Sequence, residues 1–204
     1  IVLFKEEDMP YGKVIVLNGA SSSGKTSILN QLQGLFVEPY LNVGIDKFIW
    51  MLPKPYLDRP LWDDVLGLAT ESGAMGSRLF SSMHKVIQLL SLEGMNVVAD
   101  HVMVEPEWVE ECARLFSPLP AYFVGVQCPL EVLIQREFAR KDRTLGQAEA
   151  QFPLVHKDMI YDLVVDTSLL SIEECALKIK EYIDLREPPN AFRQLARITQ
   201  VNHR

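Results

Sequence analysis

The feature that most constrains this chain is the segment 19–26, which reads G-A-S-S-S-G-K-T and fits the phosphate-loop pattern G-x-x-x-x-G-K-[ST] at every fixed position. It follows the β-branched run 13–18, which is predicted as a buried strand. Downstream, Ile28, Leu29 and Leu32 recur at helical spacing. Because strand, loop and helix occur in the order that such a loop requires, the segment predicts nucleotide binding.

The residue types of this loop suit the binding of phosphates. Its glycines allow a tight curl whose N–H groups converge on phosphate oxygens, and the following helix adds its positive N-terminal end. Lys25 is predicted to reach the β- and γ-phosphates, and the Thr26 hydroxyl to bind Mg²⁺. The predicted nucleotide-binding residues of the loop are Gly19, Ser21, Ser22, Ser23, Gly24, Lys25, Thr26 and Ser27.

Apolar runs alternate with amphipathic segments along the rest of the chain. Further strands are predicted at 40–45, 96–99, 121–126 and 161–165, and helices at 74–92, from Pro106, from Pro129 and at 172–183, with 51–73 irregular. This alternation predicts an α/β fold: a five-stranded parallel sheet with helices on both faces, in the three layers of a P-loop kinase-type sandwich. Residues 1–187 are expected to form one domain, with a lid region at about 140–152 and a loosely attached tail at 188–204.

Composition limits the partners and the compartment. The 204 residues are 48% apolar, enough for one core, and a net charge of −7 argues against a nucleic-acid partner. No apolar run is long enough to cross a bilayer, so no membrane partner is expected. Three scattered cysteines are typical of reduced thiols, and the expected location is cytoplasmic. Association into a homo-oligomer stays open.

An acid at the end of the second predicted strand is the candidate general base. The ligand crevice of an open α/β sheet lies beyond the carboxyl ends of its strands, where Asp46 is predicted to lie. The apolar residues Phe48, Trp50 and Met51 follow it, and we expect them to desolvate its carboxylate and to bind an apolar acceptor. The alternative is that Asp46 caps a helix N-terminus.

Two further acids follow predicted strands. Asp100 comes directly after an apolar run, a pattern typical of a magnesium-site acid, and helix capping is again the alternative. For Asp166 the loop or capping interpretation is favoured.

A basic cluster follows the fourth predicted strand. Arg136 and Arg140 share one helix face, while Lys141 and Arg143 fall where that helix should end. Guanidinium groups there would neutralise the charge of a transferring phosphoryl group, and Arg136 is predicted to contact the nucleotide. The alternative is that these cations only complement the helix dipole.

Several segments together resemble the chloramphenicol phosphotransferase-like family, P-loop kinases of the shikimate and gluconate kinase type. The resemblance runs from about residue 13 to 183. Its most specific segments are 15–27 (I-V-L-N-G-A-S-S-S-G-K-T-S), 43–46 (V-G-I-D), 124–128 (V-G-V-Q-C), 139–143 (A-R-K-D-R) and 155–167 (V-H-K-D-M-I-Y-D-L-V-V-D-T). Where the family's namesake has two adjacent acids after its third strand, this chain has Asp100-His101, and segment 51–80 shows little likeness.

The resemblance implies an ATP-dependent, Mg²⁺-assisted kinase that phosphorylates a hydroxyl of a small molecule, either an antibiotic or a metabolite. It implies that Asp46 acts as the base, with Lys25, Arg140 and Arg143 as the other catalytic residues. Two alternatives stay open: a regulatory nucleotide hydrolase, although no guanine-binding Asn-Lys-x-Asp is present, and a nucleoside kinase with a different acceptor.

Overall fold

The computed structural model describes residues 11–54, 75–140, 145–185 and 188–202. Of the segment predicted to be irregular, residues 55–73 lie outside the described residues. Among the described residues, no helix has both the length and the apolar character that crossing a lipid bilayer requires.

The centre of the molecule is a parallel sheet of five strands in the order β2-β3-β1-β4-β5. The strands are β1 (Val14–Asn18), β2 (Tyr40–Asn42), β3 (Asn96–His101), β4 (Ala121–Gln127) and β5 (Leu163–Asp166). β1 lies between β3 and β4, with Val16 opposite Ala99 on one side and Phe123 on the other. The predicted five-stranded parallel sheet is therefore confirmed, and the loop that follows β1 leaves its central strand.

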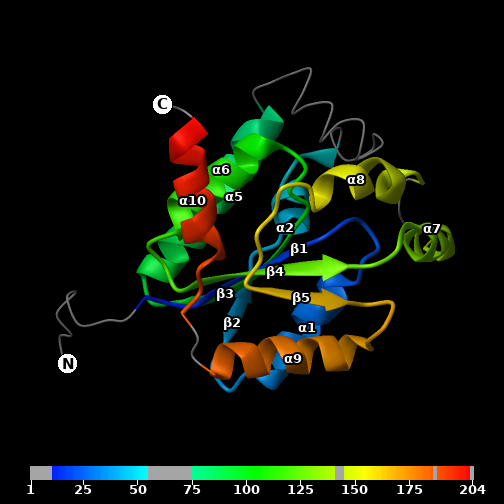
Figure 1. Cartoon of the computed structure of the whole chain (residues 1–204), viewed down its shortest axis with the longest axis horizontal. Coiled ribbons are helices and arrows are strands. Elements are labelled where there is room, and N and C mark those ends of the chain that lie inside the picture. Colours follow the sequence, from blue (N-terminus) through cyan, green and yellow to red (C-terminus); the bar gives the residue numbers. More distant parts are fainter. Residues whose placement is uncertain (1–10, 55–74, 141–144, 186–187, 203–204) are drawn as a thin grey trace.

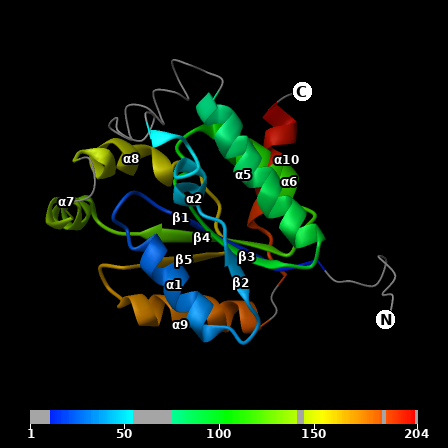
Figure 2. The same ribbon diagram turned by 180° about the vertical axis from the view of Figure 1, so that it is seen from behind.

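Helices cover both faces of the sheet, as predicted (Figures 1 and 2). In the described residues they are α1 (Lys25–Leu35), α2 (Ile45–Ile49), α5 (Met75–Leu92), α6 (Pro106–Phe116), α7 (Leu130–Ala139), α8 (Gln147–Val155), α9 (Ile172–Asp184) and α10 (Ala191–Asn202). The N-terminus of α9 has a capping box: Ser171 is the N-cap, and Glu174 stands three residues later, the spacing that this motif requires.

The alternating side chains of β1 separate two hydrophobic cores. Val14 and Val16 belong to the core under α5, α6 and α10, whereas Ile15 and Leu17 belong to the core under α1 and α9. Because successive side chains of a strand point to opposite faces, a strand covered on both sides must be apolar at every position. The uninterrupted apolar run before the phosphate loop thus reflects burial on both faces.

Two predicted strand boundaries near the site are wrong. β2 ends at Asn42, and Ile45 already begins α2, so Asp46 lies in the first turn of a helix and not at a strand end. β3 continues to His101, so Asp100 lies within the strand and not after it. In the first case Gly44, in an extended conformation, is the residue before the helix. In the second case Asp100 and His101 pair in register with Leu17 and Asn18 of β1, which extends the ladder.

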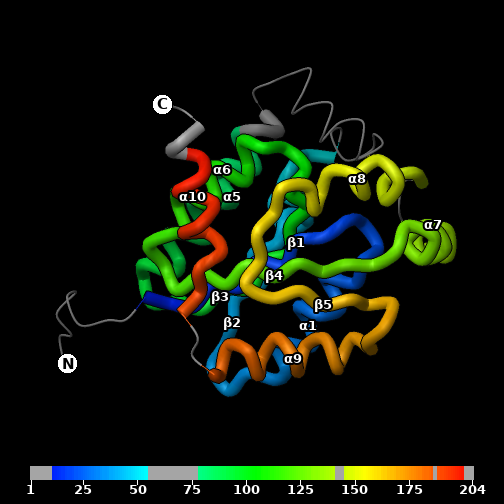
Figure 3. The backbone as a smooth tube through the Cα atoms, in the orientation of Figure 1, coloured from blue at the N-terminus to red at the C-terminus, as the bar shows by residue number. Residues whose placement is uncertain are grey.

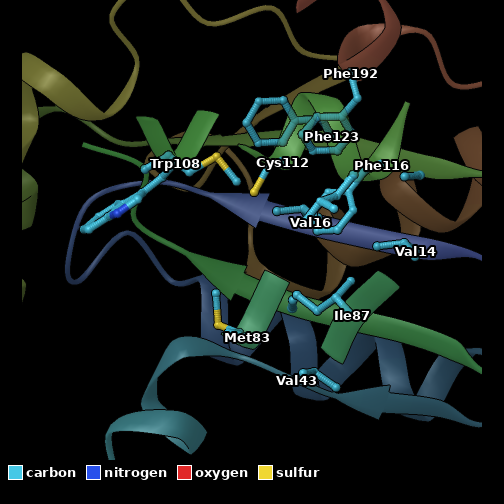
Figure 4. Close-up of a cluster of buried hydrophobic side chains, with 14 of the residues drawn as sticks. Val14, Val16, Val43, Met83, Ile87, Trp108, Cys112, Phe116, Phe123 and Phe192 are labelled. Atoms are coloured by element: carbon cyan, nitrogen blue, oxygen red, sulfur yellow. The ribbon is translucent and has the colours of Figure 1, made fainter. Parts of the chain in front are cut away.

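The expectation of a loosely attached C-terminal tail is also wrong for the described residues. α10 packs beside α6 (Figure 3), and Phe192 is buried in the core. Its ring stacks on Phe123 of β4 at a centroid distance of 4.6 Å and meets Phe116 of α6 edge-on at 5.3 Å (Figure 4). Although the C-terminal segment carries basic residues, it forms an amphipathic helix, and the apolar face of this helix completes the core under α5 and α6.

Candidate active site

The phosphate loop connects β1 to α1, and two of its residues adopt the left-handed conformation. Gly24 has φ 93° immediately before α1, which favours glycine. Ser22 has φ 63°, a value that is uncommon outside glycine and is frequent at functional loops. Gly19 has no room for a side chain, because a Cβ there would lie 2.4 Å from the carbonyl oxygen of Val126. The loop backbone is therefore curled tightly against β4.

Three serine hydroxyls of this loop lack partners. Ser21, Ser22 and Ser23 are buried, and among the described residues none of their Oγ atoms has a hydrogen-bond partner. Buried hydroxyls are normally satisfied, because an unpaired polar group in the interior costs free energy. Ser21 and Ser22 also line the cavity beside the loop, where phosphate oxygens would accept their hydrogens, so the loop fits the group that its sequence predicts.

Lys25 lies against the loop that precedes it. Its Nζ donates hydrogen bonds of 2.7 Å to the carbonyl oxygens of both Gly19 and Ala20. The side chain is buried and lines a cavity next to the loop. A buried ammonium needs acceptors or an anion, and Lys25 is here held by carbonyl groups within reach of the phosphate site.

Thr26 and Asp100 form the candidate magnesium site. The Thr26 hydroxyl donates a 2.8 Å hydrogen bond to Oδ2 of the buried Asp100 carboxylate. Hydroxyl and carboxylate oxygens are the ligands that Mg²⁺ prefers, and Mg²⁺ often takes only one or two carboxylates from the protein. Asp100 does not cap α6, the helix that follows it, since Asp100 lies within β3 and the N-cap of α6 is Glu105. The capping alternative for Asp100 is thereby excluded.

Asp46 lines the same cavity from α2. It is half-buried, and the capping alternative fails here too, because the N-cap of α2 is Gly44. The residues expected to desolvate it lie elsewhere: Phe48 is buried in the core, whereas Trp50 and Met51 are each 65% exposed, and none of the three lines the cavity.

The apolar walls of the cavity come from residues that the sequence analysis did not select. The cavity is lined by Ser21, Ser22, Gly24, Lys25, Thr26, Ser27, Ile45, Asp46, Ile49, Phe80, Asp100, Val102, Val104, Trp108, Arg140, Gln147 and Gln151. Phe80 of α5 stacks on Trp108 of α6 at a centroid distance of 4.0 Å. No local sequence signal joins these two aromatics, because the contact depends on how the two helices cross. Of the predicted loop residues, Gly19 and Ser23 shape the loop without lining the cavity.

The predicted nucleotide contact Arg136 has protein partners. Its guanidinium donates to Thr167 Oγ1 at 2.9 Å and to the Thr167 carbonyl oxygen at 2.8 Å. Thr167 Oγ1 in turn donates to the carbonyl oxygen of Ser23 in the phosphate loop at 2.9 Å. Arg136 does not line the cavity, so in this structure it braces the loop through Thr167. Asp166 accepts hydrogen bonds from Ser168, which supports the loop interpretation favoured for it.

The lid region contains a helix that was not predicted. Arg140, at the end of α7, lines the cavity as expected, whereas Arg143 lies outside the described residues. Residues 147–155 form α8, which places Gln147 and Gln151 in the cavity wall. The sequence sign of this helix is Gly146, which is its N-cap and has φ 93°. Pro153 lies inside the helix, and a proline at such a position normally argues against helical structure.

A chain of polar contacts ends at His101, the residue that follows Asp100 in β3, and both of its histidines are buried. The Glu111 carboxylate accepts from His84 Nδ1 at 2.8 Å, and His84 Nε2 is 2.8 Å from Nε2 of His101. The His84 hydrogen bond is the main cause that lowers the pKa of Glu111 to about 2, while burial lowers the pKa of His101 and keeps that ring neutral. The carbonyl of His101 accepts from Gly19 N at 3.3 Å, which connects this chain to the phosphate loop.

Fold and site together define a P-loop protein of the kinase class: a phosphate loop on the central strand of a parallel sheet, with an acid and an arginine facing one cavity. The family model for the chloramphenicol phosphotransferase-like proteins matches residues 12–184, and the chain belongs to that family. Two proteins of Mycobacterium tuberculosis, from strains CDC 1551 and H37Rv, are each 35% identical to it over 200 residues, which is 92% of this chain and 89% of theirs. Both are named as candidate O-phosphotransferases.

Solved structures share the fold at low sequence identity. The Mycobacterium tuberculosis APS kinase in complex with AMPPNP and APS is 17% identical, with a TM-score of 0.61, covering 86% of this chain and 99% of that one. Shikimate kinase from Acinetobacter baumannii in complex with shikimate is 16% identical, with a TM-score of 0.53, covering 90% and 99%. The Deinococcus radiodurans tunicamycin resistance protein is 14% identical, with a TM-score of 0.60, covering 84% and 95%. These likenesses establish the α/β fold of P-loop kinases.

Proposed function

We propose that this protein transfers the γ-phosphoryl group of ATP, with Mg²⁺, to a hydroxyl of a small molecule that is largely apolar. The observation that carries the proposal is that one cavity is lined both by the phosphate loop and by apolar walls, with the Asp46 carboxylate among its lining residues. A site for phosphates and a site for an apolar body thus share a space with a candidate base.

Each residue has a role that follows from its chemistry. The loop hydroxyls and Lys25 hold the phosphates, and Thr26 with Asp100 holds Mg²⁺. Asp46 accepts the proton of the acceptor hydroxyl, whose oxygen forms the new P–O bond as the bond to the leaving ADP oxygen breaks. Arg140 neutralises charge on the phosphoryl group, and we place Arg143 beside it on the family resemblance alone. ATP supplies the phosphoryl group.

The charges of the cavity wall support an uncharged acceptor. Among the described lining residues the cations are Lys25 of the loop and Arg140 at the C-cap of α7. The described residues that α2, α5 and α6 contribute to the wall are Ile45, Ile49, Phe80 and Trp108, and none of these is a cation. An acceptor that already carried a phosphate or carboxylate would need a cation on that wall, because burying an unpaired anion is costly.

The test is a screen of the purified protein with ATP and Mg²⁺ against hydroxyl-bearing antibiotics, chloramphenicol included, and hydroxyl-bearing metabolites. Product mass is read for the gain of one phosphoryl group, with Lys25→Met as the matched control. A product that gains the group with the wild type and not with the control supports the proposal. ATP hydrolysis that no acceptor of the panel redirects would favour the regulatory hydrolase instead.

A further inference from the structure

Gln151 of α8 connects the lid region directly to the phosphate loop. The backbone N–H of Ser21 donates a 2.6 Å hydrogen bond to Gln151 Oε1, across 130 residues of sequence. Gln151 is only 4% exposed, and it lines the same cavity as Lys25, Thr26 and Arg140. A buried carboxamide at this place is part of the site, although none of the motifs in the sequence indicated it.

The hydrogen bond to Ser21 determines which way the carboxamide faces. A backbone N–H can only donate, so the oxygen of Gln151 must face the loop and its NH₂ group must face away from Ser21. Among the described residues no acceptor pairs with Gln151 Nε2. The residue therefore retains two N–H donors in a cavity lined by phosphate-binding residues.

The helix that carries Gln151 is held at both ends. The buried Glu137 carboxylate accepts from Gly146 N at 2.8 Å and from Ala148 N at 3.0 Å, which satisfies the amides at the start of α8. At the other end, Asn18 Nδ2 donates to the Val155 carbonyl oxygen at 2.8 Å. Because both ends are held, the position of Gln151 is set before any ligand binds.

We propose that Gln151 is a catalytic residue that donates a hydrogen bond from Nε2 to the γ-phosphoryl group of ATP. This inference rests on the proposed function. A fixed, uncharged donor stabilises charge that develops on the transferring group without needing to reorganise. The hydrogen bond from Gln151 would add to the stabilisation by the charges of Lys25 and Arg140. It would also link the γ-phosphoryl group to α8, through the side chain that already contacts the loop.

The experiment compares two nucleotides by titration calorimetry with Mg²⁺: ADP, and the non-hydrolysable ATP analogue AMPPNP. A hydrogen bond to a charged group corresponds to a loss of about 10- to 100-fold in affinity when its donor is removed. We expect Gln151→Met to weaken AMPPNP by that factor more than it weakens ADP, because losing the acceptor of the Ser21 N–H affects the two nucleotides alike. Gln151→Glu still accepts from Ser21 but presents a carboxylate to the phosphate, so we expect a larger loss for AMPPNP.

The control is Glu149→Met, at an exposed position of the same helix, which should bind both nucleotides as the wild type does. Equal losses for ADP and AMPPNP in the Gln151 variants would overturn the inference, because Gln151 would then act only on the shape of the loop. If Gln151→Met fails to fold, Gln151→Glu decides between these outcomes. A wild type that binds neither nucleotide would overturn the proposed function itself, a result that differs from equal losses in the variants.

Discussion

The Thr26 hydroxyl and the Asp100 carboxylate are joined by a 2.8 Å hydrogen bond, although 74 residues separate them in the sequence. Thr26 lies in the first turn of α1, and Asp100 lies near the end of the neighbouring strand β3. The parallel pairing of β1 with β3 brings them together, because it aligns the carboxyl ends of the two strands. This pair is what makes a magnesium site at the phosphate loop a concrete proposal.

The first prediction concerns that pair. We expect Asp100→Asn to raise the Mg²⁺ concentration needed for AMPPNP binding by on the order of 10- to 100-fold, because a charged oxygen ligand is lost. Asp166→Asn is the matched control, since Asp166 is also near a strand end but lies outside the cavity. Calorimetric titrations at a series of Mg²⁺ concentrations measure both. The same Mg²⁺ dependence in both variants would remove Asp100 from the magnesium site.

A second prediction tests how tightly Asp100 is enclosed. A Cβ on Gly44 would lie 1.8 Å from Asp100 Oδ1, so Gly44→Ala must displace the carboxylate or the start of α2. We expect a loss of about 1–3 kcal/mol in the free energy of unfolding. Gly34→Ala is the control, since a Cβ there meets nothing within 4 Å, and we expect it to stabilise α1 by up to ~1 kcal/mol. Urea denaturation measures both, and similar values for the two variants would contradict the prediction.

The third prediction concerns the candidate base. We expect Asp46→Asn to bind AMPPNP as the wild type does but to transfer phosphoryl groups more slowly by on the order of 10²- to 10⁴-fold, the usual effect of losing a general base. The rate is measured on whichever acceptor the screen identifies. A matching loss of nucleotide affinity would assign Asp46 to the structure of the loop or to the metal and not to proton transfer.

The fourth prediction follows from the chain of polar contacts that ends at His101. The hydrogen bond from His84 is the main cause that lowers the pKa of Glu111 from 4.5 to about 2. The contribution of the Glu111 carboxylate to the free energy of unfolding is therefore fully present above its pKa in the unfolded chain. It is lost as the pH falls from about 4.5 toward 2. We expect the unfolding free energy of the wild type to fall more steeply over this range than that of Glu111→Gln, by up to ~1.4 kcal/mol per pH unit.

Urea denaturation at successive pH values measures that slope. Glu181→Gln, at an exposed position of α9, should keep the wild-type slope. If the slope is unchanged in Glu111→Gln as well, the contact with His84 does not hold the carboxylate in its charged form.

The sequence alone determined the parts of this protein that are built from contiguous residues. The phosphate loop depends on one strand, eight residues and one helix, so glycine placement, apolar runs and helical spacing were sufficient to predict it. The alternation of strands and helices likewise predicted a parallel sheet covered on both faces, because burial on both sides leaves a continuous apolar run in each central strand. The arginine at the end of α7 reaches the cavity as the pattern suggested.

Only the tertiary structure decided the contacts between distant segments. The pairing of Phe80 with Trp108, the place of Phe192 in the core, the bond between Ser21 and Gln151 and the chain from Glu111 to His101 each join elements that are far apart in sequence. A local pattern shows that a residue is apolar or polar, but not which partner the packing of helices on the sheet will bring to it. The local structure of the loop was therefore predictable from the sequence, whereas the walls of the cavity could be identified only from the fold.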